Sequence, residues 1–132
     1  MATKVLIVDD ERDVELLFRQ RFRREVRRGE LELLFAFSGE EALQTLHQQG
    51  RADVVLVLSD INMPGMTGLE LLQRIKAEPP PVPVCMMTAY GGADYREQAR
   101  AHDCDGYLTK PIDFKALKVQ IRVLVEQQEA QG

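Results

Sequence analysis

Short apolar runs alternate along this chain with longer segments in which apolar residues recur at helical spacing, and this alternation limits the fold more than any other feature. The run DVVLVL at 53–58 is too uniformly apolar for a strand with one face in water, so we expect a strand buried on both faces. Strands that alternate with helices form repeated βαβ units around a parallel sheet. The sequence therefore predicts an α/β fold.

Local signals set the bounds of the predicted elements. Ser38 with Glu41, and Thr67 with Glu70, have the spacing of capping boxes, and Asp113 is a suitable cap for the last helix. The prolines of EPPPVP at 78–83 exclude a helix there. We expect strands at 4–8, 32–36, 53–58, 84–88 and 106–109. We expect helices at about 12–28, from 38, from 67, at about 94–102 and from 113.

The helix predicted at 12–28 combines an apolar stripe with a basic face. The stripe consists of Val14, Leu17, Phe18, Phe22 and Val26. The basic residues are Arg19, Arg21, Arg23, Arg24, Arg27 and Arg28. Most such clusters are solvated faces, and a docking surface for an acidic partner is the alternative. Nucleic-acid binding is disfavoured, because no base-stacking aromatics are interleaved and the net charge is -4.

Length and composition fit one domain over residues 1–132, with 45% hydrophobic and 29% charged residues. No apolar run approaches the roughly 20 residues that cross a bilayer, and the N-terminus lacks a signal-peptide pattern. We therefore expect a cytoplasmic protein without membrane contact.

Charged and polar residues follow the predicted strands at one edge of the sheet. These residues are Asp9, Asp10, Asp60, Thr88 and Lys110. Ligands of open parallel sheets bind at the carboxyl ends of the strands, which is where all five should meet. Clustered carboxylates repel one another, and a hard cation with oxygen ligands relieves that repulsion. The pattern therefore predicts a site for Mg2+ at this edge.

A metal beside Asp60 makes its carboxylate a candidate nucleophile toward a phosphoryl group. Lys110 can neutralise phosphoryl oxygens, and Thr88 can donate a hydrogen bond to one of them. A phosphatase of the aspartate type needs an acid/base to activate water, often a second carboxylate two residues on, and Asn62 occupies that position. The residues indicate a site that holds a phosphoryl group rather than one that turns over substrate, with the hydrolase as the alternative.

Four sequence blocks resemble the receiver domain of two-component response regulators, a family that includes the chemotaxis regulator. The blocks are VLIVDDE, LSDINMPGMTGLELL, MMTAY and GYLTKP, in the family's order and across essentially the whole chain. The resemblance implies a five-stranded parallel, doubly wound, flavodoxin-like sheet with strand order 2-1-3-4-5. It also implies a histidine kinase or phosphotransfer protein as phosphodonor and contact of the kinase with the first helix.

The resemblance assigns roles to the residues at the strand ends. Asp60 would be the phosphoacceptor, and Asp10 and Asp60 would bind Mg2+ together with the backbone carbonyl of Asn62. Asp9 would act through a metal-bound water. Lys110 would pair with the phosphoryl group.

The resemblance also implies a conformational switch. Thr88 would move inward on phosphorylation and Tyr107 would rotate into the space it leaves, while Gly91 and Gly92 let the next loop move. The surface of the fourth helix, fifth strand and fifth helix would change. For Tyr107 the alternative is a packed strand aromatic, which is compatible with the switch role. The resemblance further implies a cis bond between Lys110 and Pro111.

The resemblance also implies that Asn62 and Tyr90 border the path of the water that hydrolyses the phosphoryl group. Asn62 can orient that water but cannot take its proton, and the ring of Tyr90 could cover its entry. We therefore expect slow autodephosphorylation, with a solvent-facing Tyr90 as the alternative.

Output and context stay open at this point. The effector is either a separate protein or a fused output domain, and phosphorylation-linked homodimers are compatible with the family. The chain is either a stand-alone regulator or part of a longer protein. A flavin or dinucleotide site is disfavoured, because no glycine-rich loop follows the first strand.

Overall fold

The computed structural model describes residues 3–89 and 104–131. The helix predicted at 94–102 and the glycine pair at 91–92 lie outside these residues. The strands are β1 (Thr3–Val8), β2 (Leu31–Ala36), β3 (Val54–Asp60), β4 (Val84–Thr88) and β5 (Gly106–Thr109). The helices are α1 (Asp13–Arg21), α2 (Arg23–Arg27), α3 (Gly39–Gln49), the 3-10 turn η1 (Arg51–Asp53), α4 (Gly68–Lys76) and α6 (Phe114–Gln131).

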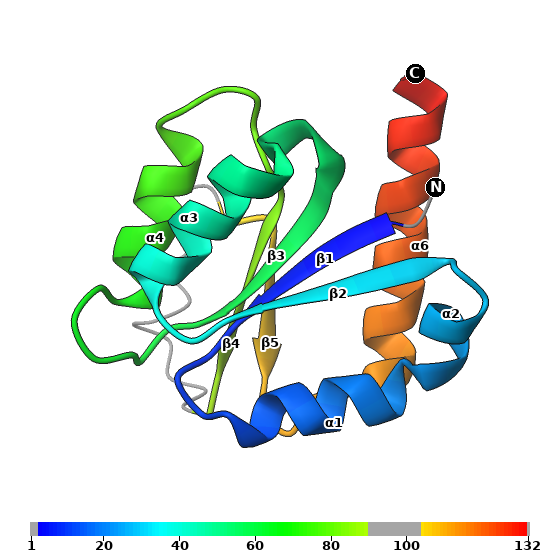
Figure 1. The fold of residues 1–132 in the computed structure, drawn as a ribbon, viewed down its shortest axis with the longest axis horizontal. Coiled ribbons are helices and arrows are strands. Elements are labelled where there is room, and N and C mark those ends of the chain that lie inside the picture. Colours follow the sequence, from blue (N-terminus) through cyan, green and yellow to red (C-terminus); the bar gives the residue numbers. More distant parts are fainter. Residues whose placement is uncertain (1–2, 90–103, 132) are drawn as a thin grey trace.

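The five strands form one parallel sheet in the order β2-β1-β3-β4-β5. Helices α3 and α4 cover one face, and α1, α2 and α6 cover the other (Figure 1). The predicted fold class and strand order are therefore confirmed. Among the described helices, none combines the length and the apolar character needed to cross a bilayer.

Each strand contributes to two hydrophobic cores, because successive side chains point to opposite faces of the sheet. In β1, Val5 and Ile7 join the core under α1 and α6, whereas Leu6 and Val8 join the core under α3 and α4. Every residue of β3 is buried, as the uniformly apolar run predicts. A sheet covered on both faces leaves its strand ends as the places where polar side chains can collect.

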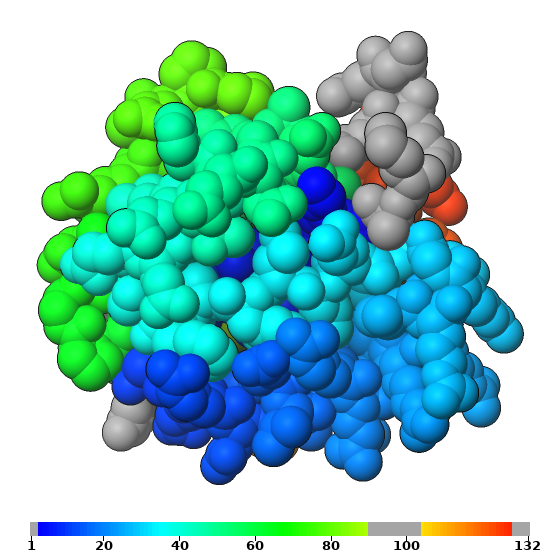
Figure 2. All heavy atoms as spheres, in the orientation of Figure 1, coloured from blue at the N-terminus to red at the C-terminus, as the bar shows by residue number. Residues whose placement is uncertain are grey.

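The edge strand β2 lies at the surface between α3 and α1, which together form the near face in Figure 2. Two arginines stack on the aromatic rings at this edge: the guanidinium of Arg12 lies 4.2 Å from the ring centre of Phe37, and that of Arg19 lies 4.8 Å from that of Phe35. These cation–π contacts shield apolar rings that would otherwise face water beside an unpaired strand edge.

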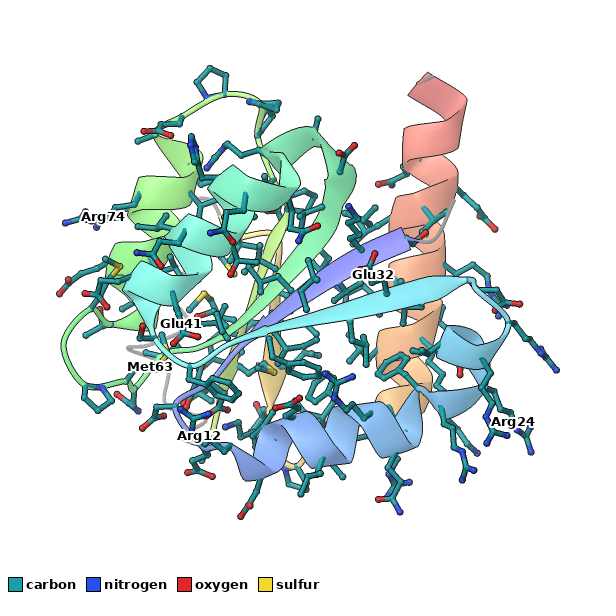
Figure 3. All side chains as sticks on the ribbon, viewed as in Figure 1. Arg12, Arg24, Glu32, Glu41, Met63 and Arg74 are labelled. Atoms are coloured by element: carbon teal, nitrogen blue, oxygen red, sulfur yellow. The ribbon has the colours of Figure 1, made fainter. Side chains whose placement is uncertain are left out.

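The single helix predicted at 12–28 is wrong, because the chain forms two helices with a break at Phe22 (φ -106°, ψ 17°). Phe18 and Phe22 are buried as expected and stack with ring centres 5.9 Å apart. Leu17 and Val26 are 39% and 41% exposed, so the predicted stripe is only partly buried. Val26 lies in α2 beyond the break, whereas Leu17 lies in α1 before it. Arg24 of α2 points away from the body of the molecule (Figure 3).

The predicted cap side chains of Ser38, Thr67 and Asp113 are confirmed as hydrogen-bond acceptors at the helix starts. The Ser38 hydroxyl accepts a hydrogen bond from the backbone N–H of Glu41, and the Thr67 hydroxyl accepts one from that of Glu70, both at 3.2 Å. Asp113 caps α6 by accepting from the N–H groups of the second and third residues after it. The Thr67 cap fixes the start of α4 beneath the end of β3.

Gly68, the first residue of α4, packs directly on the end of β3. Its N–H donates to the Ile61 carbonyl at 2.8 Å, and a Cβ at this position would lie 2.1 Å from the Asp60 carbonyl oxygen. Backbone atoms cannot give way as a flexible side chain can. This glycine therefore allows the close approach that holds the Asp60 backbone in place.

We predict that Gly68→Ala lowers the free energy of unfolding by about 2–3 kcal/mol, because the added methyl must displace the backbone at Asp60. Urea unfolding followed by circular dichroism measures this. Gly65→Asn is the control, since Gly65 has φ +74° and open space around it, and asparagine tolerates that conformation at a cost of about 1 kcal/mol or less. Equal stability of Gly68→Ala and the wild-type protein would contradict the close-packing account.

Candidate phosphoacceptor and metal site

Two of the acidic side chains sit on backbone that the sheet holds rigidly. Asp9 directly follows β1, and its N–H donates to the Ala36 carbonyl of β2 at 3.1 Å. Asp60 is the last residue of β3, and the next N–H, that of Ile61, donates to the Met87 carbonyl of β4 at 3.1 Å. The parallel register thus brings the ends of β1 and β3 side by side.

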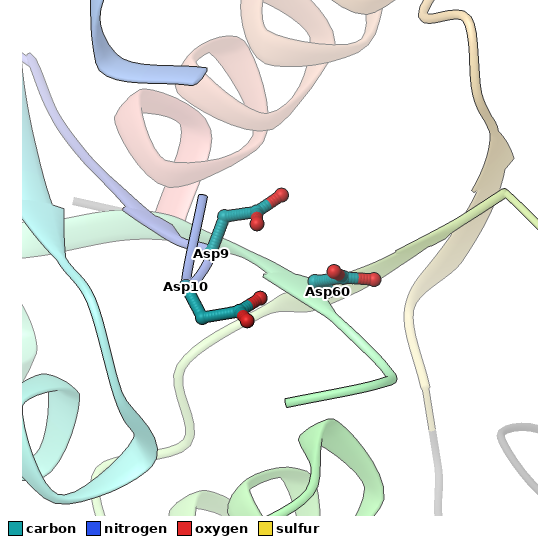
Figure 4. A group of neighbouring side chains, drawn as sticks. All are labelled: Asp9, Asp10 and Asp60. Atoms are coloured by element: carbon teal, nitrogen blue, oxygen red, sulfur yellow. The ribbon is translucent and has the colours of Figure 1, made fainter. Parts of the chain in front are cut away.

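The structure brings Asp9, Asp10 and Asp60 together, as the sequence predicts. Their carboxylates point toward a common space at the strand ends (Figure 4), with oxygen atoms within 4.8 Å of one another. Asp9 and Asp60 are 2% and 8% exposed, whereas Asp10 is open to solvent. One Asp9 oxygen accepts the N–H of Glu11 at 3.0 Å, which fixes its orientation. Two buried carboxylates and one accessible carboxylate therefore share one site.

Lys110 supplies the cation of the site from the loop after β5. Its backbone N–H donates to the Thr88 carbonyl at 2.8 Å, so the end of β4 positions it. Its ammonium lies 2.8 Å from an Asp9 oxygen and 3.6 Å from an Asp60 oxygen. The hydrogen bond goes to Asp9, and the contact with Asp60 is a longer ion pair. The bond between Lys110 and Pro111 is cis, as the resemblance implies.

The protonation equilibria reflect this crowding. Burial raises the pKa of the Asp60 carboxyl above its ordinary value, and the charge of Asp9 raises it further. The charge of Lys110 and nearby backbone N–H groups lower this pKa without cancelling the rise. For Lys110, burial lowers the pKa, but the hydrogen bond to Asp9 and the charge of Asp60 outweigh it, and the pKa is raised. Burial of the carboxyl is thus the main reason that the pKa of Asp60 stays above its ordinary value.

The oxygen-only donor set fits a hard divalent cation. Three carboxylates with oxygens this close match the ligand preference of Mg2+, Ca2+ or Mn2+, and the set lacks the histidine or thiolate ligands that favour zinc. The three carboxylates also outnumber the Lys110 ammonium, which lies within ion-pair distance of Asp9 and Asp60. The acidic triad is therefore consistent with a metal site.

Thr88 and Tyr107 lie on the same face of the sheet. Thr88 ends β4 and is fully buried, and strand alternation places it on the face of Met86. Tyr107 of β5 is half-buried, pairs in register with Met86, and packs against the core under α3 and α4. Asn62 is exposed two residues beyond Asp60. Tyr90 lies outside the described residues.

A hollow of about 660 Å3 adjoins the site between α1 and the loop that connects β5 to α6. Its lining includes Glu11 and Lys110 at the site and Val14 and Leu17 on α1. The sequence analysis missed this hollow because it placed Leu17 in the core. The sequence carries no clear signal of this exposure: Leu16 and Leu17 are 70% and 39% exposed, whereas the adjacent Leu71 and Leu72 of α4 are both fully buried.

The chain matches known proteins along most of its length. The family model described as the response regulator receiver domain matches residues 5–122. Response regulator protein FleR of Pseudomonas aeruginosa is 38% identical over 117 residues, which cover 89% of this chain and 23% of FleR. Sporulation initiation phosphotransferase F of Bacillus subtilis is 30% identical over 122 residues, which cover 92% of this chain and 93% of that protein. The chain thus spans less than a quarter of the length of FleR and nearly all of the sporulation initiation phosphotransferase.

Solved structures agree with the sequence matches. A CheY-like response regulator receiver domain protein from Methanospirillum hungatei superposes with a TM-score of 0.85 at 26% identity, covering 100% of both chains. The chemotaxis protein CheY4 of Vibrio cholerae superposes with a TM-score of 0.79 at 25% identity, covering 94% of this chain and 99% of CheY4.

We predict a coupling free energy of about 1–3 kcal/mol between Asp9 and Lys110, because their ion pair is largely shielded from solvent. A double-mutant cycle of Asp9→Asn and Lys110→Met, unfolded in urea with a chelator present, measures it. The exposed pair of Glu15 and Arg19, with side chains 31% and 55% exposed, is the control and should give about 0.3–0.5 kcal/mol. A coupling at Asp9 and Lys110 no larger than the control would show that this ion pair does not hold the site together.

Proposed function

We propose that this chain works as a signalling switch whose phosphoacceptor is Asp60. The premise is that the chain belongs to the response regulator receiver domain family. The observation that carries this proposal is the acidic triad at the strand ends with Lys110 beside it. Asp60 is the member of the triad at the centre of the sheet edge, fixed by β4 on one side and by Gly68 beneath. A carboxylate oxygen of Asp60 would attack phosphorus and displace the donor's leaving group.

We propose that the metal of the site is Mg2+, bound by Asp10 and Asp60 with the backbone carbonyl of Asn62, while Asp9 acts through a water. The cation would supply positive charge to the phosphoryl oxygens and relieve the repulsion among the carboxylates. Asp10 is exposed, which leaves the site open to a cation from solvent. Lys110 would turn from Asp9 toward the phosphoryl group, a short movement because its ammonium already lies 3.6 Å from Asp60.

Thr88 and Tyr107 would report the state of Asp60 to the surface. The Thr88 carbonyl accepts a hydrogen bond from the backbone N–H of Lys110. A movement of Lys110 toward the phosphoryl group would therefore act directly on the end of β4. Both side chains belong to one face of the sheet, which supports the proposal that inward movement of Thr88 makes room for the Tyr107 ring. The surface that changes would comprise the helix predicted at 94–102, β5 and α6.

The proposed activity is self-phosphorylation followed by slow autodephosphorylation, not turnover of a substrate. Asn62 supports this, since an amide at the second position after Asp60 cannot act as a general base. We propose that Asn62 and Tyr90 together set the rate of dephosphorylation. A phosphatase-type hydrolase is not favoured by any contact in the described residues.

Receiver domains of two-component systems interact with histidine kinases, and we propose that the donor here is a histidine kinase or a phosphotransfer protein. The hollow between α1 and the loop after β5 would receive it, because its wall includes Lys110 and exposed Leu17 and opens beside the triad. We propose residues 1–132 as one receiver domain acting in the cytoplasm. Its output would pass to a separate effector, a fused domain or a homodimer partner.

We predict that acetyl phosphate with Mg2+ adds one phosphoryl group to the wild-type protein and none to Asp60→Asn, because a small donor needs only the nucleophile and the metal. Intact-mass spectrometry measures the product. Asp53→Asn is the control, since Asp53 is exposed in η1 at the opposite end of β3, and it should be phosphorylated normally. A phosphoryl group on Asp60→Asn would place the acceptor elsewhere.

We predict that beryllofluoride, which mimics a phosphoryl group, changes amide exchange around residues 88–110 in the presence of Mg2+. The change should be absent in Asp60→Asn and reduced in Thr88→Val, whose side chain has similar volume but no hydroxyl. Hydrogen–deuterium exchange followed by mass spectrometry measures it. Unaltered exchange in the wild-type protein would argue against the switch while leaving the acceptor assignment intact.

A further inference from the structure

The positive charge of this chain is concentrated in one short segment. Residues 19–28 contain six arginines and one glutamate, a net charge of +5, so the remainder of the chain carries -9 of the total of -4. An acidic partner approaching this molecule would be directed to that segment and away from the rest of the surface.

Two of the six arginines have roles within the fold. Arg19 pairs with Glu15 at 2.8 Å and stacks on Phe35, and Arg21 lies 5.5 Å from the ring centre of Phe114. The other four are exposed and form no ion pair with any described residue, and we refer to them as the α2 arginines. They are Arg23, Arg24, Arg27 and Arg28.

The α2 arginines destabilise the helix that carries them. Arg23 and Arg27 are separated by four residues, as are Arg24 and Arg28, and like charges at this spacing destabilise a helix. Helix α2 has five residues and no side-chain cap at its start. A negative helix terminus can offset one or two cations but not four. Glu25 of α2 forms its ion pair with Lys118, so the exposed charges of the α2 arginines are screened mainly by solvent.

A hollow of about 210 Å3 lies beside α2, between that helix, the start of β2 and α6. Its apolar wall consists of Phe22, Leu31, Ile121 and Val125. The charged residues around it nearly cancel, because Lys118 pairs with Glu25 at 3.1 Å and Arg122 faces the same hollow as Glu30. The excess positive charge beside the hollow therefore comes from the α2 arginines.

This surface is remote from the phosphoacceptor site. Thr3 and Leu31, at the starts of β1 and β2, line the hollow, whereas the triad lies at the opposite ends of the strands. Figure 3 shows Arg12, which follows Asp10 by two residues in the sequence, and Arg24 at opposite ends of the α1–α2 segment. A partner could occupy this surface and leave the triad open.

We propose that the α2 arginines and the adjoining hollow form a docking surface for an acidic amphipathic helix of a partner protein. Carboxylates of that helix would pair with the arginines, and one or two apolar side chains would enter the hollow. Nucleic acid fits less well, because the described surface offers no exposed aromatic beside the arginines and the remaining -9 repels a long phosphate backbone. An anionic membrane would meet the same repulsion, and its flat surface would not fill a hollow.

The test uses a fluorescent helical peptide of about 18 residues, rich in glutamate, with leucines at every third or fourth position. Fluorescence anisotropy at low salt measures its binding to the full chain. The variant Arg23→Gln/Arg24→Gln/Arg27→Gln/Arg28→Gln should bind at least about tenfold more weakly, and the matching fourfold Arg→Lys variant should stay within about threefold of wild type. Val125→Trp should also weaken binding, since it fills the hollow without a change of charge.

Further controls separate this surface from general attraction to cations. Arg74→Gln, on the exposed side of α4, should leave binding unchanged, whereas Arg24→Gln alone should weaken it. The fourfold Gln variant should unfold at no lower urea concentration than wild type, because it removes repulsion. The proposal is overturned by absence of saturable peptide binding, by equal binding of the Gln variant, or by tighter binding to duplex DNA or phosphatidylserine vesicles than to the peptide.

Discussion

Negative charge gathered at the carboxyl edge of the parallel sheet is the constraint on which the rest of this structure depends. Asp9 and Asp60 are 2% and 8% exposed, held by backbone hydrogen bonds between neighbouring strands, and cannot separate without breaking the sheet. One ammonium, that of Lys110, lies within ion-pair distance of both. Among the described residues, three carboxylates share this site with the Lys110 ammonium, so negative charge is in excess; burial, and then the charge of Asp9, raise the pKa of Asp60. Binding of a cation or phosphorylation of Asp60 would therefore change the electrostatic energy of this carboxylate cluster.

The surrounding elements fix the positions of these charged groups and connect them to the surface. Gly68 lets α4 begin directly under the Asp60 carbonyl, and the Thr67 cap fixes that helix start. On the other side, Lys110 is bonded through its backbone to the Thr88 carbonyl, so the cation and the end of β4 move together. The same sheet carries Tyr107 on the face of Thr88. A change of charge at Asp60 thus has a short, covalent and hydrogen-bonded route to β4 and β5.

Much of this arrangement could be predicted from the sequence, because its causes are local or follow from topology. Uniform apolar runs define buried strands, Ser38 and Thr67 define helix starts, and parallel strands must bring residues that follow them to one edge. The break at Phe22 could not be predicted in this way. The sequence around it contains no proline or glycine, and Phe18 and Phe22 pack against Phe114 of the distant helix α6, with ring centres 5.3 and 5.9 Å apart. Sequence spacing likewise does not predict that Lys110 forms its hydrogen bond with Asp9 and not with Asp60, because this choice depends on side-chain geometry.

The central proposal is that the acidic triad is short of positive charge and that a divalent cation supplies it. Urea unfolding of the wild-type protein and Asp10→Ala, with and without Mg2+ at matched ionic strength, tests this most directly. At a Mg2+ concentration about a hundredfold above the dissociation constant, the wild-type protein should gain about 2–3 kcal/mol of stability, and Asp10→Ala should gain little. Without Mg2+, Asp10→Ala should be at least as stable as wild type, since one repelling charge is gone. An equal gain in both proteins, or no gain in either, would contradict the account.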